Sequence, residues 1–174
     1  MENPRSVDNY RGFVETVIRR SNNPAETAFQ AVMRRADNPN QCSAAWEFLV
    51  PFCDIADERQ RLCFALVGAA IAREKPDADG TGSVGMALRK ICGADSEAQE
   101  REKRRLRRLI ACDTTWDLIP VLRPILRYIQ SKGGSVNYTE LLRELLYWNE
   151  KTRVAWTRDF FRKNIDAAPE EEAE

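Results

Sequence analysis

Histidine is absent from the 174 residues of this chain. It is the most frequent general base in enzymes and the commonest metal ligand, so its absence excludes the usual acid–base arrangements. The sequence also lacks a glycine-rich phosphate loop followed by Lys-Ser or Lys-Thr. Its acidic residues are scattered, and Asp113 and Asp117, near the most basic segment, are better explained as helix caps than as nuclease carboxylates. We therefore expect a protein that is not an enzyme and that binds no cofactor.

Long apolar runs and paired cysteines are missing as well. No run approaches the roughly 20 residues that a membrane-spanning helix needs, and the first residues do not form the apolar core of a secretory signal. We expect a cytoplasmic protein with no membrane contact. The five cysteines include no C-x-x-C pair, and without histidine a zinc site would need unusual ligands. We expect no metal site, and we expect buried free thiols at Cys42, Cys53, Cys63, Cys92 and Cys112.

The charges of the chain are numerous and unevenly placed. Lysine and arginine together number 27, aspartate and glutamate number 27, and the formal net charge is zero. Residues 101–108 hold six cations and one acid, whereas residues 166–174 hold five acids and no cation. Without that acidic segment, 27 cations face 22 acids and the net charge is +5. Such local basic density indicates a polyanionic partner, and most of the cations are Arg, whose forked donors suit phosphate groups.

Apolar residues recur at intervals of three and four along nearly the whole chain, and no segment alternates like a strand. This pattern predicts an all-α protein with about eight or nine helices in two packed helical lobes. We expect an N-terminal helical lobe at residues 1–93, a C-terminal helical bundle at 94–165 and an acidic, disordered tail at 166–174. The weakest boundary, and therefore the predicted division between the lobes, lies between Gly93 and Ser96.

Breakers and capping residues place the individual helices. The helix at about residues 57–73 is apolar nearly all round and should be central. Pro120 and Pro124 should kink or restart the helix in which they lie, because neither has a backbone N–H. The other helices are expected near residues 10–18, 24–33, 45–50, 83–93 and 151–164, with further helices capped by the pairs Ser96 and Gln99, Thr114 and Asp117, and Asn137 and Glu140.

Two glutamates are placed to share the charge of the basic run. Glu97 and Glu100 precede Arg101 and Arg104 by four residues, the spacing that favours an ion pair on one helix face. The buried face of the same helix is defined by Leu106, Leu109 and Ile110. The arginines left without a partner in the helix are Arg105, Arg107 and Arg108. A solvated charged face, pairing with acids elsewhere in the fold, and binding of nucleic acid are the three explanations of this set.

A second basic group follows on the next helix. Arg123 and Arg127 fall on one side of it, and its apolar residues fall on the other. Trp116 shares the basic side, and an aromatic side chain among arginines is typical of a surface that binds single-stranded nucleic acid. We nevertheless expect Trp116 to pack in the core, because Trp side chains are highly buried on average.

Three blocks of the sequence resemble one protein family. Residues 137–161, NYTELLRELLYWNEKTRVAWTRDFF, resemble the signature of CasB, the small subunit of the type I-E CRISPR Cascade complex. Residues 46–52, WEFLVPF, resemble the family's aromatic-rich stretch that ends in Pro-Phe, and residues 82–88, GSVGMAL, resemble its Ser-Leu-Gly-x-Ala-Leu block. The blocks consist mostly of core residues, but their order and spacing cover nearly the whole chain.

The resemblance implies a non-catalytic, all-helical subunit of an RNA-guided surveillance complex. Such subunits lie along the assembly as a head-to-tail pair with a second copy. They contact the other Cascade subunits, with guide RNA as a further partner, and they help to hold the displaced single strand of target DNA. With the basic pattern, this predicts nucleic-acid contacts at Arg105, Arg107, Arg108, Arg123, Arg127, Lys151 and Arg153, and further candidates at Arg59, Lys75 and Arg89.

Two other functions fit the same residues. A free-standing helical DNA-binding regulator would bind duplex DNA at least as well as single strands, but no recognition-helix pattern with a turn of about three or four residues stands out. A protein-only helical scaffold would use the arginines to dock acidic partner proteins. The salt dependence of nucleic-acid binding separates this scaffold from the CasB-like function.

Overall fold

The computed structural model describes residues 4–162, with side chains from residue 9 onward, so the predicted tail at 166–174 and the end of the predicted last helix lie outside the described residues. The described chain is all-α, as predicted, with nine α-helices, one 3-10 helix and no strand. None of these helices is both long and apolar enough to span a membrane. The elements are α1 (Pro4–Ser21), α2 (Thr27–Met33), η1 (Cys42–Ala45), α3 (Trp46–Leu49), α4 (Glu58–Glu74), α5 (Val84–Cys92), α6 (Ser96–Ile110), α7 (Thr115–Ser131), α8 (Tyr138–Leu146) and α9 (Glu150–Phe161).

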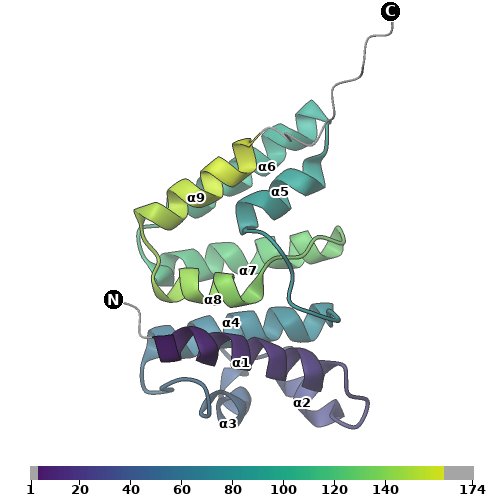
Figure 1. The fold of residues 1–174 in the computed structure, drawn as a ribbon, viewed down its shortest axis with the longest axis vertical. Coiled ribbons are helices and arrows are strands. Elements are labelled where there is room, and N and C mark those ends of the chain that lie inside the picture. The colour runs from purple at the N-terminus through teal and green to yellow at the C-terminus, as the bar shows by residue number, and fades with distance from the viewer. Residues whose placement is uncertain (1–3, 163–174) are drawn as a thin grey trace, which may run out of the picture.

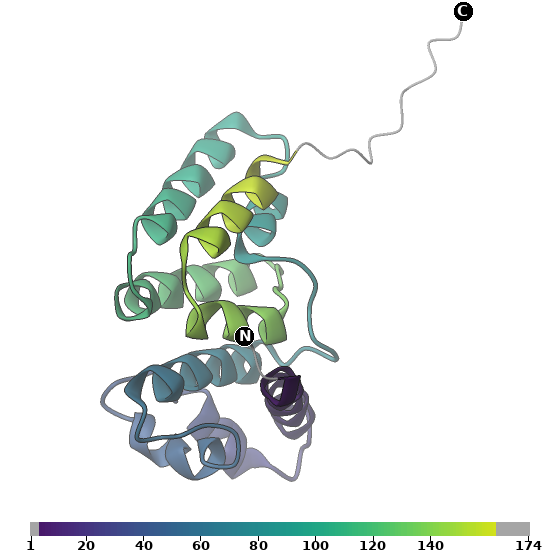
Figure 2. The same cartoon turned by 60° about the vertical axis from the view of Figure 1, so that its left-hand side comes forward.

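The helices are stacked in layers (Figure 1). The first four α-helices lie at one end of the molecule, α7 and α8 lie in the middle, and α5, α6 and α9 lie at the other end (Figure 2). The segment at residues 75–83 runs from α4 past the middle layer to α5. As a result, α5 packs mainly against α9 and α6. The division of the chain into two lobes between Gly93 and Ser96 stays a prediction.

The helix α4 is the centre of the fold, as its composition predicts. Its N-cap is Asp57, whose carboxylate accepts a hydrogen bond from the Gln60 backbone N–H at 3.2 Å. Every residue from Cys63 to Ala72 is buried. A helix with no polar face needs neighbours on all sides, and α1, α2, α3, α7 and α8 supply them. The buried apolar residues consequently form one cluster that extends from α1 to α9.

Two of the predicted capping pairs are confirmed. The Thr114 hydroxyl accepts a hydrogen bond from the Asp117 N–H at 3.2 Å and starts α7. The Asn137 side chain accepts one from the Glu140 N–H at 2.8 Å and starts α8. Each side chain satisfies a backbone donor that has no partner within its helix, and so fixes the residue at which the helix begins.

Two predicted helix starts are wrong. The helix α2 begins at Thr27, because Pro24 lies in a preceding turn. The helix α6 is capped by Asp95 rather than by Ser96, since the Asp95 carboxylate accepts the hydrogen bond from the Glu97 N–H at 3.0 Å. In both places several capping residues stand side by side in the sequence, and the pattern alone does not decide between them.

The helix α7 runs as one element through both prolines, so they do not restart it, and the kink that was the other expectation stays a prediction. Each proline removes one hydrogen bond, to the carbonyl four residues earlier. Pro120 and Pro124 both lie on the exposed side of the helix, and so does Trp116. The carbonyls that lose their donors, those of Trp116 and Pro120, therefore face solvent, where water can replace the missing N–H.

All five cysteine thiols are free, and Cys63, Cys92 and Cys112 are buried as predicted. Cys42 and Cys53 are only partly buried, so the prediction is wrong for these two. Burial raises the pKa of Cys53 to about 11 and that of Cys63 to about 12. At neutral pH both side chains are thiols rather than thiolates, and they act as small apolar groups.

The helices α5 and α9 approach each other most closely at Gly85. A Cβ atom built on Gly85 would lie 2.0 Å from the carbonyl oxygen of Trp156 and 2.8 Å from its carbonyl carbon. Both atoms belong to the backbone of α9, so the contact could be relieved only by moving a whole helix. Glycine is therefore required at this position, because no other residue lacks a Cβ.

Gly85→Ala should lower the free energy of unfolding by about 1 to 3 kcal/mol, the usual cost of overpacking a core. Gly12→Ala is the matched control: Gly12 lies inside α1 with no atom within 4 Å of its Cβ position. Alanine there should stabilise the helix by up to about 1 kcal/mol. Thermal unfolding followed by circular dichroism measures both changes. A native melting temperature for Gly85→Ala would contradict the close approach.

A partly buried carboxyl group joins α8 to α9. The indole N–H of Trp156 donates a hydrogen bond to the Glu144 side chain at 2.8 Å. The pKa of Glu144 is raised from its ordinary value of 4.5 to about 7, chiefly by burial and to a smaller extent by the neighbouring carboxylates of Glu140 and Asp159. The Trp156 hydrogen bond and the nearby Arg143 lower it, without offsetting the burial.

The raised pKa of Glu144 predicts a pH-dependent stability. Between about pH 4.5 and pH 7 the folded chain holds a proton that the unfolded chain has released, so stability falls as the pH rises through this window. Glu144→Gln keeps the acceptor for Trp156 without the charge. At pH 8 the free energy of unfolding of this variant should be about 3 kcal/mol higher than that of the native chain. At pH 4 the two should match. Denaturant unfolding across pH checks this, with exposed Glu150→Gln as the control that should not change the slope.

Candidate nucleic-acid interface

A single buried carboxylate gathers three arginines. The Asp37 side chain is only 1% exposed, and it lies in the turn that follows α2. Arg73, at the end of α4, binds both of its oxygens at 3.0 Å. Arg123 and Arg127 on α7 approach the same carboxylate at 3.6 Å. One negative charge therefore faces three guanidinium groups, and the cluster keeps a net charge of +2.

A second buried carboxylate fixes Arg105. The Glu102 side chain, also 1% exposed, accepts hydrogen bonds from Arg105 and from the Tyr128 hydroxyl, both at 2.7 Å. The Arg105 guanidinium carbon lies 3.9 Å from the centre of the Tyr128 ring. The prediction that Arg105 has no partner in its helix is therefore wrong. The partner is three residues away rather than four, on the side of α6 that faces α7.

We call Arg73, Arg105, Arg123 and Arg127 the arginine band. The band crosses α4, α7 and α6, and α7 lies between the other two helices (Figure 1). With the carboxylates of Asp37 and Glu102 included, the band carries a net charge of +2. Its guanidinium groups are held by ion pairs and by an aromatic ring, so a ligand would find them already ordered.

The outer face of α6 adds exposed cations next to the band. Arg101 pairs with Glu97 at 3.8 Å, as predicted. Glu100 pairs with Lys103 at 3.0 Å, so the predicted pair with Arg104 is wrong. Within the described residues, the arginines of this helix that make no ion pair or side-chain hydrogen bond are Arg104, Arg107 and Arg108.

The remaining predicted residues have varied surroundings. Lys75 donates a hydrogen bond to the Gln30 side chain at 3.0 Å, and Gln30 also accepts one from Arg34. Arg73 of the band donates to the carbonyl of the same Arg34. Lys75 is therefore linked to the arginine band through Gln30 and Arg34. No hydrogen bond or ion pair connects the other four to the band in the described structure: Arg59, Arg89, Lys151 and Arg153.

Those four residues are spread over three helices. Arg59 is partly buried in the first turn of α4, and Arg89 donates to the Gly93 carbonyl at 3.1 Å. Lys151 is exposed in the first turn of α9, and Arg153 pairs with Asp113 at 3.2 Å. Their nucleic-acid contacts stay predictions.

Trp116 is half exposed, at 50%, so the expectation that it packs in the core is wrong. The inward positions of the first turns of α7 are taken by Thr115, Leu118 and Ile119, all of which are buried. Trp116 points to the same side of the helix as Arg123, seven residues further on. The spacing of apolar residues in α7 places Trp116 on the exposed, basic side. The general preference of Trp side chains for protein interiors led to the wrong expectation.

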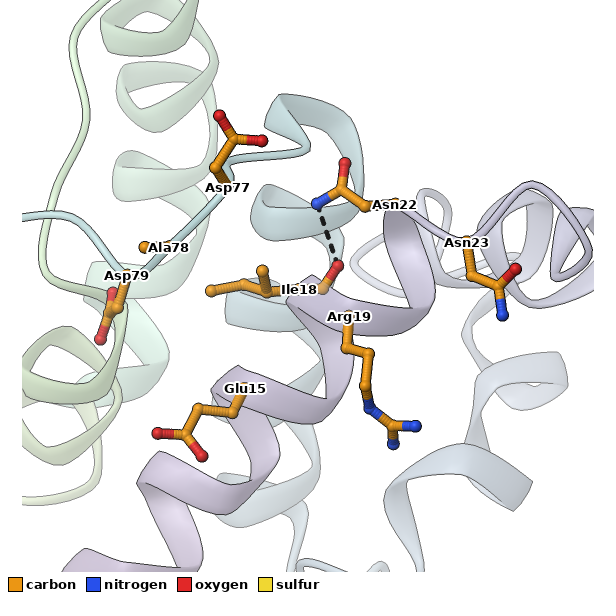
Figure 3. A pocket seen from close by; sticks show the side chains of 8 residues that line it. All are labelled: Glu15, Ile18, Arg19, Asn22, Asn23, Asp77, Ala78 and Asp79. Carbon is orange, nitrogen blue, oxygen red and sulfur yellow. Dashed lines mark hydrogen bonds between the residues drawn. The ribbon is translucent and has the colours of Figure 1, made fainter.

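A pocket beside α1 is unsuited to a polyanion. It has a volume of about 570 Å³ and lies between α1 and the segment at residues 77–79 (Figure 3). Glu15, Asp77 and Asp79 line it, with Arg19 as the one cation among the lining residues. The Asp79 carboxylate is already engaged, because it accepts hydrogen bonds from the first N–H groups of α8. A nucleic-acid site is therefore expected on the arginine band and not here.

The sequence model of the family described as "CRISPR-associated protein Cse2" matches residues 30–161, which are 132 of the 174 residues. Two solved structures share the fold. One is TTHB189, a CRISPR-associated protein of the Cse2 family from Thermus thermophilus, with 21% identity and a TM-score of 0.70. The other is CasB from Thermus thermophilus, with 20% identity and a TM-score of 0.66. Each alignment covers 87% of this chain and 97% of the other. No curated protein matches the chain.

The protein is thus an all-helical, CRISPR-associated protein, and the chain belongs to the Cse2 family. The resemblance to CasB that the three sequence blocks indicate is confirmed by this match and by the shared fold. The matched region extends from the middle of α2 to the end of α9, so it contains Asp37 and Glu102, the two carboxylates that pair with the arginine band.

Replacing Asp37 by Ala should be strongly destabilising. Three guanidinium groups would remain around an unfilled site, and removing one partner of a buried ion pair typically costs about 3 to 5 kcal/mol. Asp113→Ala is the control, since Asp113 pairs with Arg153 but is 85% exposed, and such surface pairs contribute about 1 kcal/mol or less. Urea unfolding measures both. Similar small losses for the two variants would show that Asp37 does not organise the arginines.

Proposed function

We propose that this protein is the non-catalytic small subunit of an RNA-guided Cascade complex and that it binds the displaced, non-target strand of DNA. The arginine band and the outer face of α6 are the surfaces assigned to the strand, with guide RNA as a further contact. The Cse2 family match supports the assembly, and the basic surface supports the ligand. Other Cascade subunits and a second copy of the chain are the protein partners that this function requires.

The observation that carries the proposal is the excess of guanidinium groups around Asp37. Pairing with acids inside the fold accounts for one of the three positive charges, and the surplus is available to an external anion. Arginine forks bind phosphate oxygens in pairs, which suits a nucleic-acid backbone. The band contains no side chain placed to read base edges from a recognition helix, so binding with little sequence preference is expected.

The energetics of strand exchange give such contacts a role. Replacing a DNA duplex by a guide-RNA heteroduplex is nearly balanced in free energy, so modest contacts to the freed strand can shift the equilibrium. A subunit with this task needs no catalytic group. A free-standing regulator and a protein-only scaffold are the competing functions, and they differ from the proposal in duplex preference and in salt dependence.

Binding of labelled single-stranded and duplex DNA across salt concentrations tests the proposal. Single strands should bind better than duplex, with a log–log salt slope of about −0.7 for each phosphate neutralised. Arg123→Ala with Arg127→Ala should weaken single-strand binding and flatten the slope, while Asp37 keeps its bidentate partner Arg73. Arg107→Ala with Arg108→Ala should also weaken it.

The matched control removes two cations from another surface. Arg11 and Arg19 are exposed on α1 and make no ion pair in the described structure. Their double Ala variant should bind single strands nearly as well as the native chain. Duplex preference would favour the regulator. A slope near zero, or equal losses in all double variants, would contradict binding at the arginine band.

A further inference from the structure

A second pocket, of about 440 Å³, lies where three segments meet: residues 80–81, the outer side of α5, and the turn at 132–135 between α7 and α8. Among the described residues that line it there is no acid and there are two lysines, Lys90 and Lys132. Thr81 and Ser135 add two hydroxyl groups. This composition is opposite to that of the acidic pocket beside α1 (Figure 3).

The walls of the pocket are fixed by backbone contacts. The Asn137 N–H donates to the Gly82 carbonyl at 2.9 Å and so joins the two loops. At Gly80 the loops are so close that a Cβ atom would lie 2.3 Å from the Val136 carbonyl oxygen. The Asp79 carboxylate accepts hydrogen bonds from the start of α8 and ties the same loop down. The pocket therefore exists before any ligand arrives.

Two of the lining residues, Thr81 and Ser135, have free hydrogen-bond donors, whereas the N–H groups of the turn at 132–134 are used. Within the described structure, the backbone N–H and hydroxyl groups of Thr81 and Ser135 make no hydrogen bond. The C-terminal end of α7 would repel an anion if its carbonyls were open. The carbonyls of Tyr128, Ile129 and Gln130 are occupied instead, because the N–H groups of the turn at 132–134 donate to them. A Cβ on Gly133 would meet no atom within 4 Å, so the backbone is accessible there.

The pocket adjoins the arginine band through one aromatic ring. The Lys132 ammonium group lies 5.9 Å from the centre of the Tyr128 ring. The same ring lies under the guanidinium of Arg105, at 3.9 Å. A strand bound along the band would therefore pass the mouth of the pocket, and one of its phosphates could enter.

From this geometry we propose that the pocket lined by Lys90, Lys132, Thr81 and Ser135 binds a phosphate group. Two ammonium groups supply the charge, and hydroxyl and backbone N–H groups supply directed donors, the combination that phosphate oxygens require. As a contact for the displaced strand, the site rests on the proposed function. As a phosphate site it does not, because free inorganic phosphate offers the same chemistry.

The test uses the full chain and two probes. Inorganic phosphate is titrated into isotope-labelled protein, and the amide signals of Thr81 and Ser135 should shift in a saturable way. Labelled single-stranded DNA is then titrated across salt. The variant Lys90→Ala with Lys132→Ala should abolish the phosphate-dependent shifts and reduce the salt slope by about 0.7, the value for one phosphate. Arg11→Ala with Arg19→Ala is the control of equal charge loss, and melting curves establish that each variant is folded.

Each outcome has a separate meaning. Loss of both phosphate shifts and DNA affinity in the lysine variant assigns the pocket to a phosphate of the strand. Loss of the phosphate shifts with unchanged DNA binding assigns it to free phosphate. Shifts that remain in the lysine variant, or that fall elsewhere, together with unchanged DNA binding, overturn the pocket. That result leaves the proposed function intact if the variant Arg123→Ala with Arg127→Ala binds single-stranded DNA more weakly than the native chain does.

Discussion

The fold depends on the need to cover α4 on every side. The run from Cys63 to Ala72 has no polar face, so α1, α7 and α8 pack around it and the shorter helices close the remaining side. The first exposed turn after this run carries Arg73, which emerges next to Asp37. Because α7 buries its apolar side against α4, its other side presents Arg123 and Arg127 to the same carboxylate. The basic surface is thus a consequence of how the core is covered.

Burying a carboxylate costs free energy of desolvation. Selection for stability alone would therefore favour apolar residues at such positions. Two of them, Asp37 and Glu102, are nevertheless retained beneath arginines. Asp37 orients three guanidinium groups whose combined charge exceeds its own, and Glu102 orients the single guanidinium of Arg105. A self-contained ion pair would leave no surplus, and a solvated face would not need a buried partner. The surplus charge around Asp37 supports the proposed binding of an external anion, which would meet guanidinium groups that are already ordered.

The sequence predicts those features that depend on local spacing. The all-α class, the central α4 and the caps at Thr114 and Asn137 follow from periodicity and from single capping side chains. The ion pairs of Asp37 do not, because Arg73 and Arg127 lie far from it along the chain and only the packing of α4 and α7 brings them together. Glu102 is an intermediate case.

Glu102 shares one helix face with Leu106 and Leu109, at intervals of four and three, so the periodicity that identified the buried leucines also indicated a buried glutamate. An acid on an apolar face needs a cationic or hydroxyl partner, and Arg105 and Tyr128 fill that role. The pocket proposed to bind phosphate had no such signal. Its glycines read as turn residues, and only the contact between the 80–82 loop and Val136 converts two turns into one cavity.

The zero net charge of the chain constrains how the basic surface can act. A polyanion far from the molecule experiences almost no attraction, because the field of a neutral protein is screened over a Debye length of about 8 Å at physiological salt. The arginine band attracts a nucleic-acid strand electrostatically only when the strand is already within a few ångströms. A free-standing DNA-binding protein gains its association rate from a long-range field, whereas a subunit of an assembly receives its strand from neighbouring subunits. Charge that is segregated locally and cancelled globally therefore suits a surface that retains a strand better than one that searches for it.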